Sequence, residues 1–183
     1  MNRIDVLPIG EVERGLLERL APPLAREFEA DCRLLPGPLD PRFAFHPERQ
    51  QHHSTELLAG MRPQLSNGAW RLLGVAEVDL YIPILTFVFG EAQMNGPCAL
   101  LSTHRLRQEL YGLPPDPELL FQRLLKEAVH ELGHTVGLTH CDDHECAMAA
   151  AHAVEWIDLK GPGLCSFCHH QVFASNNKNL AGV

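Results

Sequence analysis

The run from His130 to His140 constrains this chain more than any other feature. It reads His-Glu-Leu-Gly-His-Thr-Val-Gly-Leu-Thr-His. On a helix, residues i and i+4 project from one face, so His130 and His134 can bind one ion between their imidazoles. Gly137 tolerates positive φ and can end the helix, which brings His140 in from the far side of a turn. Three protein ligands leave one tetrahedral position open, as expected of a catalytic zinc.

Glu131 is placed to act as a general base rather than as a fourth ligand. At 100° per residue it lies about 60° from His134 around the helix. A carboxylate there can hydrogen-bond a metal-activated water and accept its proton. Two histidines at this spacing could also be solvated side chains, but Glu131, Gly137 and His140 together argue against that interpretation. The extended motif is the signature of one clan of zinc proteases and predicts a metal-dependent hydrolase.

A helix over about 117–136 is predicted to carry the motif. Asp116 can cap its N-terminus, and Pro117 suits the first helical position. Seven residues form one broad apolar face that should pack on a core: Leu120, Phe121, Leu124, Leu125, Ala128, Leu132 and Val136. The first two histidines of the motif lie nearly opposite that face.

Four of the six cysteines gather near the end of the chain and predict a second metal site. They are Cys141, Cys146, Cys165 and Cys168. A C-x2-C pair lets two thiolates reach one ion from a tight turn, and two further cysteines about twenty residues away complete a four-cysteine site. Such a site leaves no position for substrate and should be structural. A disulfide is the alternative interpretation, but it requires an oxidising compartment, which nothing in the sequence suggests.

The run from His130 through Met148, followed by Cys165 and Cys168, resembles the archaemetzincin family of zinc metallopeptidases in the metzincin clan. The resemblance implies two zinc ions per chain, one catalytic and one structural. It implies that the catalytic zinc is bound by His130, His134 and His140, that Glu131 is the general base, that Met148 forms the turn beneath the site, and that the structural zinc is bound by Cys141, Cys146, Cys165 and Cys168.

The resemblance covers most of the chain, from about residue 4 to residue 170. The stretch 78–112 looks like the upper subdomain of the family. The resemblance therefore implies a single metallopeptidase domain over 1–183. Its upper subdomain would span about 1–137 and its lower subdomain about 138–183, with the active-site cleft between them.

Hydrophobic patterns predict an α+β fold with a mixed sheet and packed helices. Strands are expected at Ile4–Ile9, Cys32–Leu35, Leu72–Tyr81, Thr86–Phe89 and Ala99–Ser102, where branched or aromatic residues lie between Gly and Pro. Helices are expected at Glu11–Glu29, interrupted near Pro22 and Pro23, and at about His52–Met61. A larger sheet-and-helix part followed by a small zinc-stapled part fits this order.

An edge strand beside the cleft is expected to bind substrate. In the resembled clan, the strand nearest the cleft offers its backbone to an extended peptide. By order in the chain this strand should be Thr86–Phe89, with Phe87, Val88, Phe89 and Gly90 as the residues concerned. The alternative is that Phe87–Phe89 is simply a strand of the core.

The charge of the chain limits its partners. Fifteen basic and 23 acidic residues give a formal net charge of −8, which argues against nucleic acid or an anionic membrane as a partner. The longest apolar region, Leu80–Phe89, is too short to cross a bilayer. The first residues do not form a signal-peptide core, so a cytoplasmic location, where thiolates stay available for zinc, is expected.

The function predicted from these patterns is hydrolysis of a peptide bond by a zinc-activated water. A second interpretation is a zinc-stabilised module that binds peptides or proteins with little or no hydrolysis. A third is a zinc hydrolase that acts on a non-peptide amide. No residue of the sequence fixes a specificity pocket, the choice between endopeptidase and aminopeptidase, or the oligomeric state.

Overall fold

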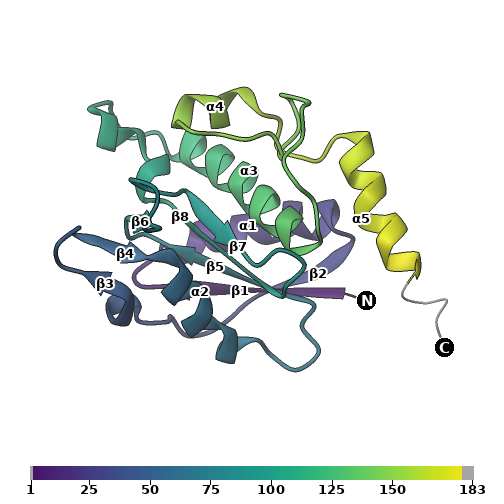
Figure 1. Ribbon diagram of the computed structural model, residues 1–183, viewed down its shortest axis with the longest axis horizontal. Coiled ribbons are helices and arrows are strands. Elements are labelled where there is room, and N and C mark those ends of the chain that lie inside the picture. Colours follow the sequence, from purple (N-terminus) through teal and green to yellow (C-terminus); the bar gives the residue numbers. More distant parts are fainter. Residues whose placement is uncertain (1, 179–183) are drawn as a thin grey trace.

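The computed structural model describes residues 2–178, and a five-stranded mixed sheet forms its centre (Figure 1). The strand order is β2-β1-β5-β8-β7. The strands are β1 (Asn2–Ile9), β2 (Ala30–Leu34), β5 (Arg71–Ala76), β7 (Gly90–Ala92) and β8 (Cys98–Ser102). All neighbouring pairs are parallel except β7 with β8, which is antiparallel and places β7 at one edge.

A second sheet lies beside one end of the first. It contains β3 (Phe45–His46), β4 (Gln51–His53) and β6 (Leu80–Tyr81) in the order β3-β4-β6. The pair β3 and β4 is antiparallel, whereas β4 and β6 are parallel. The predicted α+β fold with a mixed sheet is confirmed.

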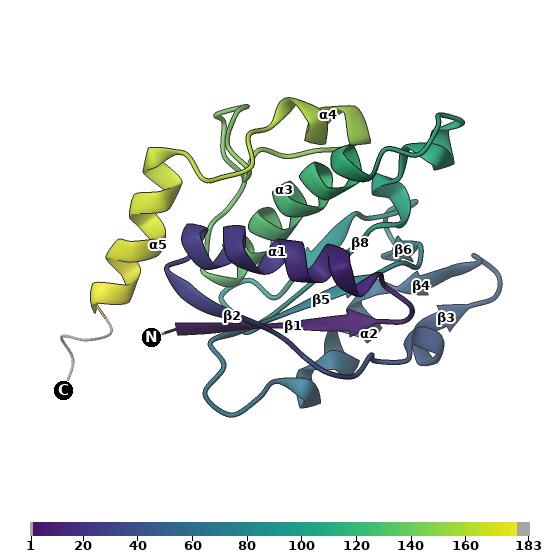
Figure 2. The same cartoon turned by 180° about the vertical axis from the view of Figure 1, so that it is seen from behind.

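Helices cover both faces of the main sheet. Helices α1 (Arg14–Glu27) and α3 (Pro117–Thr135) pack on one face and α2 (Ser54–Met61) on the other (Figures 1 and 2). Each face has its own apolar cluster. Helix α4 (Val154–Leu159) lies over α3, and α5 (Ser166–Lys178) flanks the fold. The 3₁₀ helices are Pro41–Ala44, Arg62–Gln64, His104–Leu106 and Gln108–Tyr111.

The predicted interruption of the first helix is wrong, because α1 continues through Pro22 and Pro23. Neither proline has an N–H, so the carbonyl groups of Glu18 and Arg19 lose their helical partners. Both of these residues are exposed, so water can replace the missing hydrogen bonds.

The predicted strand Leu72–Tyr81 is in fact two strands in different sheets. Between β5 and β6, the carboxylate of Asp79 accepts hydrogen bonds from Arg105 at 2.6 and 2.7 Å, and its carbonyl accepts one from the His52 N–H at 2.8 Å. The Ser102 hydroxyl donates to the Val78 carbonyl at 2.6 Å. The Ser102 bond holds the backbone at the end of β8, and the Asp79 bonds then direct it toward β4.

The predicted edge strand Thr86–Phe89 is also wrong. Within it only Val88 forms a β-bridge, an isolated one with Leu80, and the Phe89 carbonyl accepts a hydrogen bond from the Ser102 N–H at 2.9 Å. Side chains take the place of a strand partner, since Arg49 donates to the carbonyls of Leu85 and Thr86 at 3.0 Å. The strand at this edge of the main sheet is instead β7, which shares only Gly90 with the segment proposed from the sequence.

Candidate active site and metal centres

Helix α3 begins and ends as the sequence predicts. The Asp116 carboxylate accepts hydrogen bonds from the N–H groups of Glu118 and Leu119 at 3.1 and 2.9 Å. At the other end, Gly137 has φ +93°, which a residue with a side chain rarely adopts. The Leu138 N–H then donates to the Gly133 carbonyl at 3.0 Å and closes the turn. The motif histidines therefore stand on the last two turns of α3 and just beyond it.

The first two histidines are oriented by backbone carbonyls. Nδ1 of His130 lies 2.9 Å from the Ala147 carbonyl, and Nδ1 of His134 lies 2.8 Å from the Leu138 carbonyl. A carbonyl only accepts, so each neutral ring carries its proton on Nδ1 and leaves a lone pair on Nε2. The two Nε2 atoms are 3.1 Å apart. Without a metal ion, two lone pairs facing each other at this distance would repel. With one, the spacing is normal, because two nitrogens bound to the same tetrahedral zinc lie roughly 3.3 Å apart.

His140 completes the group from beyond the turn. Its ring centre lies 5.2 Å from those of both His130 and His134. One nitrogen from each ring lies within 4.8 Å of the others. His130 is buried and His140 is exposed, so the group of three extends from the interior to the surface. The structure thus brings together the three histidines expected from the sequence, and their donor set fits zinc.

Burial keeps these imidazoles in the form that binds metal. It lowers the pKa of His130 well below the ordinary value, and the Lys160 charge adds to this effect. It also lowers the pKa of His134 and of His140. Neutral imidazole is the species that coordinates a metal ion, so all three rings are ready to bind at neutral pH.

Glu131 is buried beside the histidines. Burial raises its pKa well above the ordinary value, and the nearby carboxylates of Glu127 and Glu91 act in the same direction. A cation at the histidine centre would act in the opposite direction and favour the carboxylate. Glu131 thus lies beside the three histidines but is not part of their donor group, as expected from the sequence.

A cleft of about 600 Å³ opens above the histidine centre. Residues 85–92 line one wall, and Ala150, Ala151 and His152 line another. The segment Phe87–Gly90, expected from the sequence to bind substrate, is on the first wall, although Phe87–Phe89 does not form a strand of the main sheet. Edge strand β7 follows on the same wall.

Two charged groups in the cleft were missed from the sequence. The Lys160 ammonium lies 3.1 Å from the Glu127 carboxylate, with side chains only 2% and 4% exposed. Both residues line the cleft. Helical spacing does place Glu127 on the polar face of the helix with His130 and His134, but the sequence indicates no role for it. No comparable signal exists for Lys160, which is 33 residues away along the chain.

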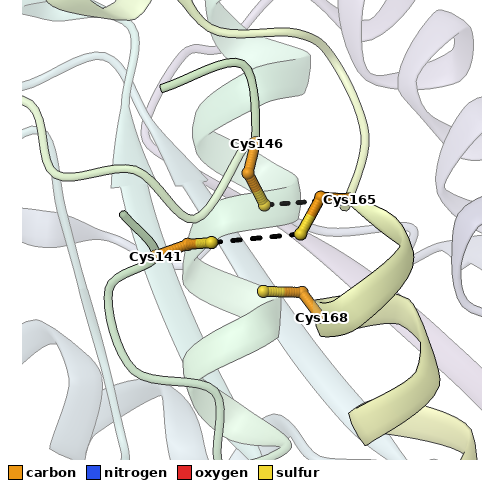
Figure 3. Close-up of side chains that lie close together, drawn as sticks. All are labelled: Cys141, Cys146, Cys165 and Cys168. Atoms are coloured by element: carbon orange, nitrogen blue, oxygen red, sulfur yellow. Dashed lines mark hydrogen bonds between the residues drawn. The ribbon is translucent and has the colours of Figure 1, made fainter. Parts of the chain in front are cut away.

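The four predicted cysteines converge in a second centre (Figure 3). Cys141 and Cys146 come from the loop after α3, whereas Cys165 and Cys168 come from the start of α5. Their sulfur atoms lie within 4.8 Å of one another, and those of Cys141 and Cys165 are 3.9 Å apart. All six cysteines are free.

The sulfur spacing favours a metal over a disulfide. A disulfide holds its sulfurs about 2.05 Å apart, whereas Zn–S bonds of about 2.3 Å in a tetrahedron separate them by roughly 3.8 Å. Burial also raises the pKa of the Cys146 and Cys168 thiols. A bound cation would be needed for all four to be thiolates at neutral pH. The donor set therefore fits a closed zinc site.

Met148 lies between the two centres. It is fully buried, and its sulfur packs against Gly133 of α3, which lies between His130 and His134 in the sequence. Its carbonyl accepts a hydrogen bond from the Cys141 N–H at 3.0 Å. The methionine thus supports the helix from below and fixes the first cysteine.

Comparison with known proteins agrees with this geometry. The model of peptidase family M54 matches residues 56–173. The archaemetzincin of Methanocaldococcus jannaschii is 40% identical over 166 residues, covering 91% of this chain and 90% of that protein. The chain belongs to the archaemetzincins. It is therefore a zinc metallopeptidase, and the resemblance seen in the sequence is confirmed.

Solved archaemetzincin structures share the fold. The structure from Methanopyrus kandleri has a TM-score of 0.84 and 30% identity, covering 96% of each chain. The structure from Archaeoglobus fulgidus, complexed with malonate, has a TM-score of 0.80 and 34% identity, covering 92% of this chain and 99% of the other. Within residues 2–178, no helix of this archaemetzincin is both long and apolar enough to cross a bilayer.

Proposed function

We propose that this archaemetzincin hydrolyses peptide bonds with Glu131 as the general base and with His130, His134 and His140 as ligands of a catalytic zinc. The observation that carries the proposal is the pair of Nε2 atoms of His130 and His134, which face each other without protons at the floor of a cleft. Glu131 lies beside them in the same cleft.

Zinc bound by the three histidines would supply a Lewis acid that polarises the scissile carbonyl and lowers the pKa of a bound water to about 7. Glu131 then accepts the proton of the attacking water and passes it to the leaving amine. The buried setting that raises its pKa suits this role, because the carboxyl group must hold the proton between the two transfers.

The substrate is proposed to bind along the wall formed by residues 85–92. Strand β7 pairs with β8 on one side only, so its outer side can add an extended peptide through backbone hydrogen bonds. Gly90, at the start of β7, leaves room for Glu131 next to that backbone. Leu85 and Phe87 give the wall an apolar surface, which favours apolar side chains in the peptide.

The four cysteines are proposed to hold a second, structural zinc. This zinc would tie the loop after α3 to the start of α5 and so staple residues 138–178. We further propose a single domain with an upper part over about 1–137 and a lower part over about 138–183, of which residues 1 and 179–183 lie outside the described range.

Digestion of a peptide library tests the proposal. Cleavage by the wild type that disappears on treatment with a chelator, and that is absent in Glu131→Ala without a chelator, would support the peptidase mechanism. Tight binding of peptides without cleavage would instead favour a zinc-stabilised binding module. Zinc content should be measured in the same samples, so that loss of metal is separated from loss of the base.

A further inference from the structure

A third group of metal-binding side chains lies outside both zinc centres. It consists of His46 from β3, His53 from β4 and Glu56 from the first turn of α2. One Glu56 oxygen, Oε1, lies 3.3 Å from Nε2 of His46 and 3.0 Å from Nδ1 of His53. The three donor atoms all lie within 4.8 Å of one another. We name these residues the His46 cluster.

The fold holds these side chains together from several directions. His46 pairs with Gln51 across the β3–β4 hairpin, and His53 pairs with Tyr81 of β6. The Tyr81 ring stacks on the His53 ring at 5.3 Å and meets the His46 ring edge-on at 5.6 Å. Two imidazoles are thus fixed against one aromatic ring with their nitrogens turned toward the same carboxylate.

We propose that the His46 cluster binds a third divalent cation, zinc or another late first-row metal. Two imidazoles and one carboxylate are a ligand set that these metals prefer. The side chains are 44%, 18% and 44% exposed for His46, His53 and Glu56, so water can fill the remaining coordination positions. The site is therefore open and exchangeable, unlike the four-cysteine centre.

The alternative is that hydrogen bonds alone hold the cluster, with one N–H of each imidazole donated to Glu56 Oε1. In the proposed site the cation takes the place of the two protons in these hydrogen bonds. A fixed positive charge lies nearby on Arg49, whose guanidinium is 4.0 Å from the Tyr81 ring centre. Its charge is directed at the carbonyls of Leu85 and Thr86, which leaves the Glu56 carboxylate to the two histidines and the cation.

The proposed cation would strengthen the second sheet. The second sheet has strands of only two or three residues, and pairing of that length adds little stability by itself. The cation would join β3 and β4 to α2. The residues after His53 are Ser54 and Thr55, whose hydroxyls donate to the Glu91 carboxylate in the cleft wall. Metal binding should therefore also stabilise that wall.

Zinc binding to the holoenzyme tests this proposal. Protein that holds its two tight zincs is dialysed against increasing free zinc, and bound zinc per chain is measured by elemental analysis. We expect a third equivalent in the wild type and in the control His170→Ala, which removes an exposed histidine outside the three clusters. His46→Ala and His53→Ala should lose it while keeping two zincs.

Glu56→Gln provides a gentler variant, because the amide keeps the shape and an oxygen acceptor but lacks the charge. Its third zinc should bind more weakly, by at least the ~10–100-fold typical of changes around a metal site. The proposal is overturned if wild-type protein never exceeds two zincs, or if the third zinc persists in His46→Ala and His53→Ala. None of these outcomes depends on the catalytic role of Glu131.

Discussion

The Glu131 carboxylate lies against the bare Cα of Gly90. A Cβ on Gly90 would lie 2.6 Å from Glu131 Oε1 and 2.6 Å from the Leu100 carbonyl oxygen. Both distances are far shorter than a normal contact. The side chain of the proposed general base therefore occupies the volume that a side chain at position 90 would need. This explains why β7 has a glycine there, although glycine usually weakens a strand.

Gly90→Ala should reduce turnover while both zincs remain bound. The new methyl group must displace Glu131 or move β7 away from β8, and a displacement of about 1 Å near reacting groups costs about 10²-fold in rate. Peptide hydrolysis and zinc content measured on the same preparation check this. Gly37→Ala is the control, because no atom lies within 4 Å of its new Cβ. Unchanged turnover in Gly90→Ala would contradict the close packing.

Gly133→Ala should destabilise the protein, although the same change usually stabilises a helix. In a helix interior alanine is favoured over glycine by about 1 kcal/mol. At Gly133 the methyl group would overlap the Met148 sulfur, and overpacking of this kind costs about 1–3 kcal/mol. Urea unfolding measures the difference. Gly15→Ala, in the exposed first turn of α1, should leave the free energy of unfolding unchanged or raise it slightly, and a gain in stability at Gly133 would disprove the contact.

The four-cysteine centre was predicted from cysteine spacing and from the family resemblance, although its two halves lie far apart in the chain. The helix and the histidine centre could be predicted because their signals are local. Asp116, Gly137 and the histidine spacing each define geometry within a few residues. Strand β7 could not be predicted, since Gly-Glu-Ala has little strand propensity and is held by pairing with β8. The Lys160–Glu127 pair was missed for a related reason, because tertiary packing brings its members together across 33 residues. The members of the His46 cluster are close in sequence, but the short hairpin of β3 and β4 that places His46 near His53 and Glu56 was not predicted.

Asp79 should make stability depend on pH. Burial acts to raise the pKa of Asp79, but hydrogen bonds from Arg105 and Gln51 outweigh it and hold the pKa below the ordinary value. The stabilisation is therefore fully present above the unfolded pKa of about 4. It is lost as the pH falls through the lower folded value.

Asp79→Asn should thus lower the free energy of unfolding by about 2 kcal/mol at pH 7, because it removes a charged hydrogen-bonded pair. The difference between variant and wild type should shrink as the pH approaches 3. Urea unfolding of both proteins at several pH values measures it. A difference that stays constant from pH 7 to pH 3 would contradict the depressed pKa.

His140→Ala should affect the two zincs unequally. The variant removes the exposed ligand of the histidine centre and leaves the four cysteines intact. Zinc per chain should fall from two to one after brief treatment with a mild chelator, whereas the wild type should retain more. Equal loss of both zincs would show that the two centres behave as one folding unit.

The most direct test of the central claim compares hydrolysis of one peptide by wild type and by Glu131→Gln at equal zinc content. The amide keeps the size of the side chain but cannot accept the proton. We predict unchanged zinc per chain and a fall in kcat of about 10²–10⁴-fold, the usual contribution of a general base. Turnover within a few-fold of wild type, with zinc fully bound, would contradict the assignment of Glu131 as the base.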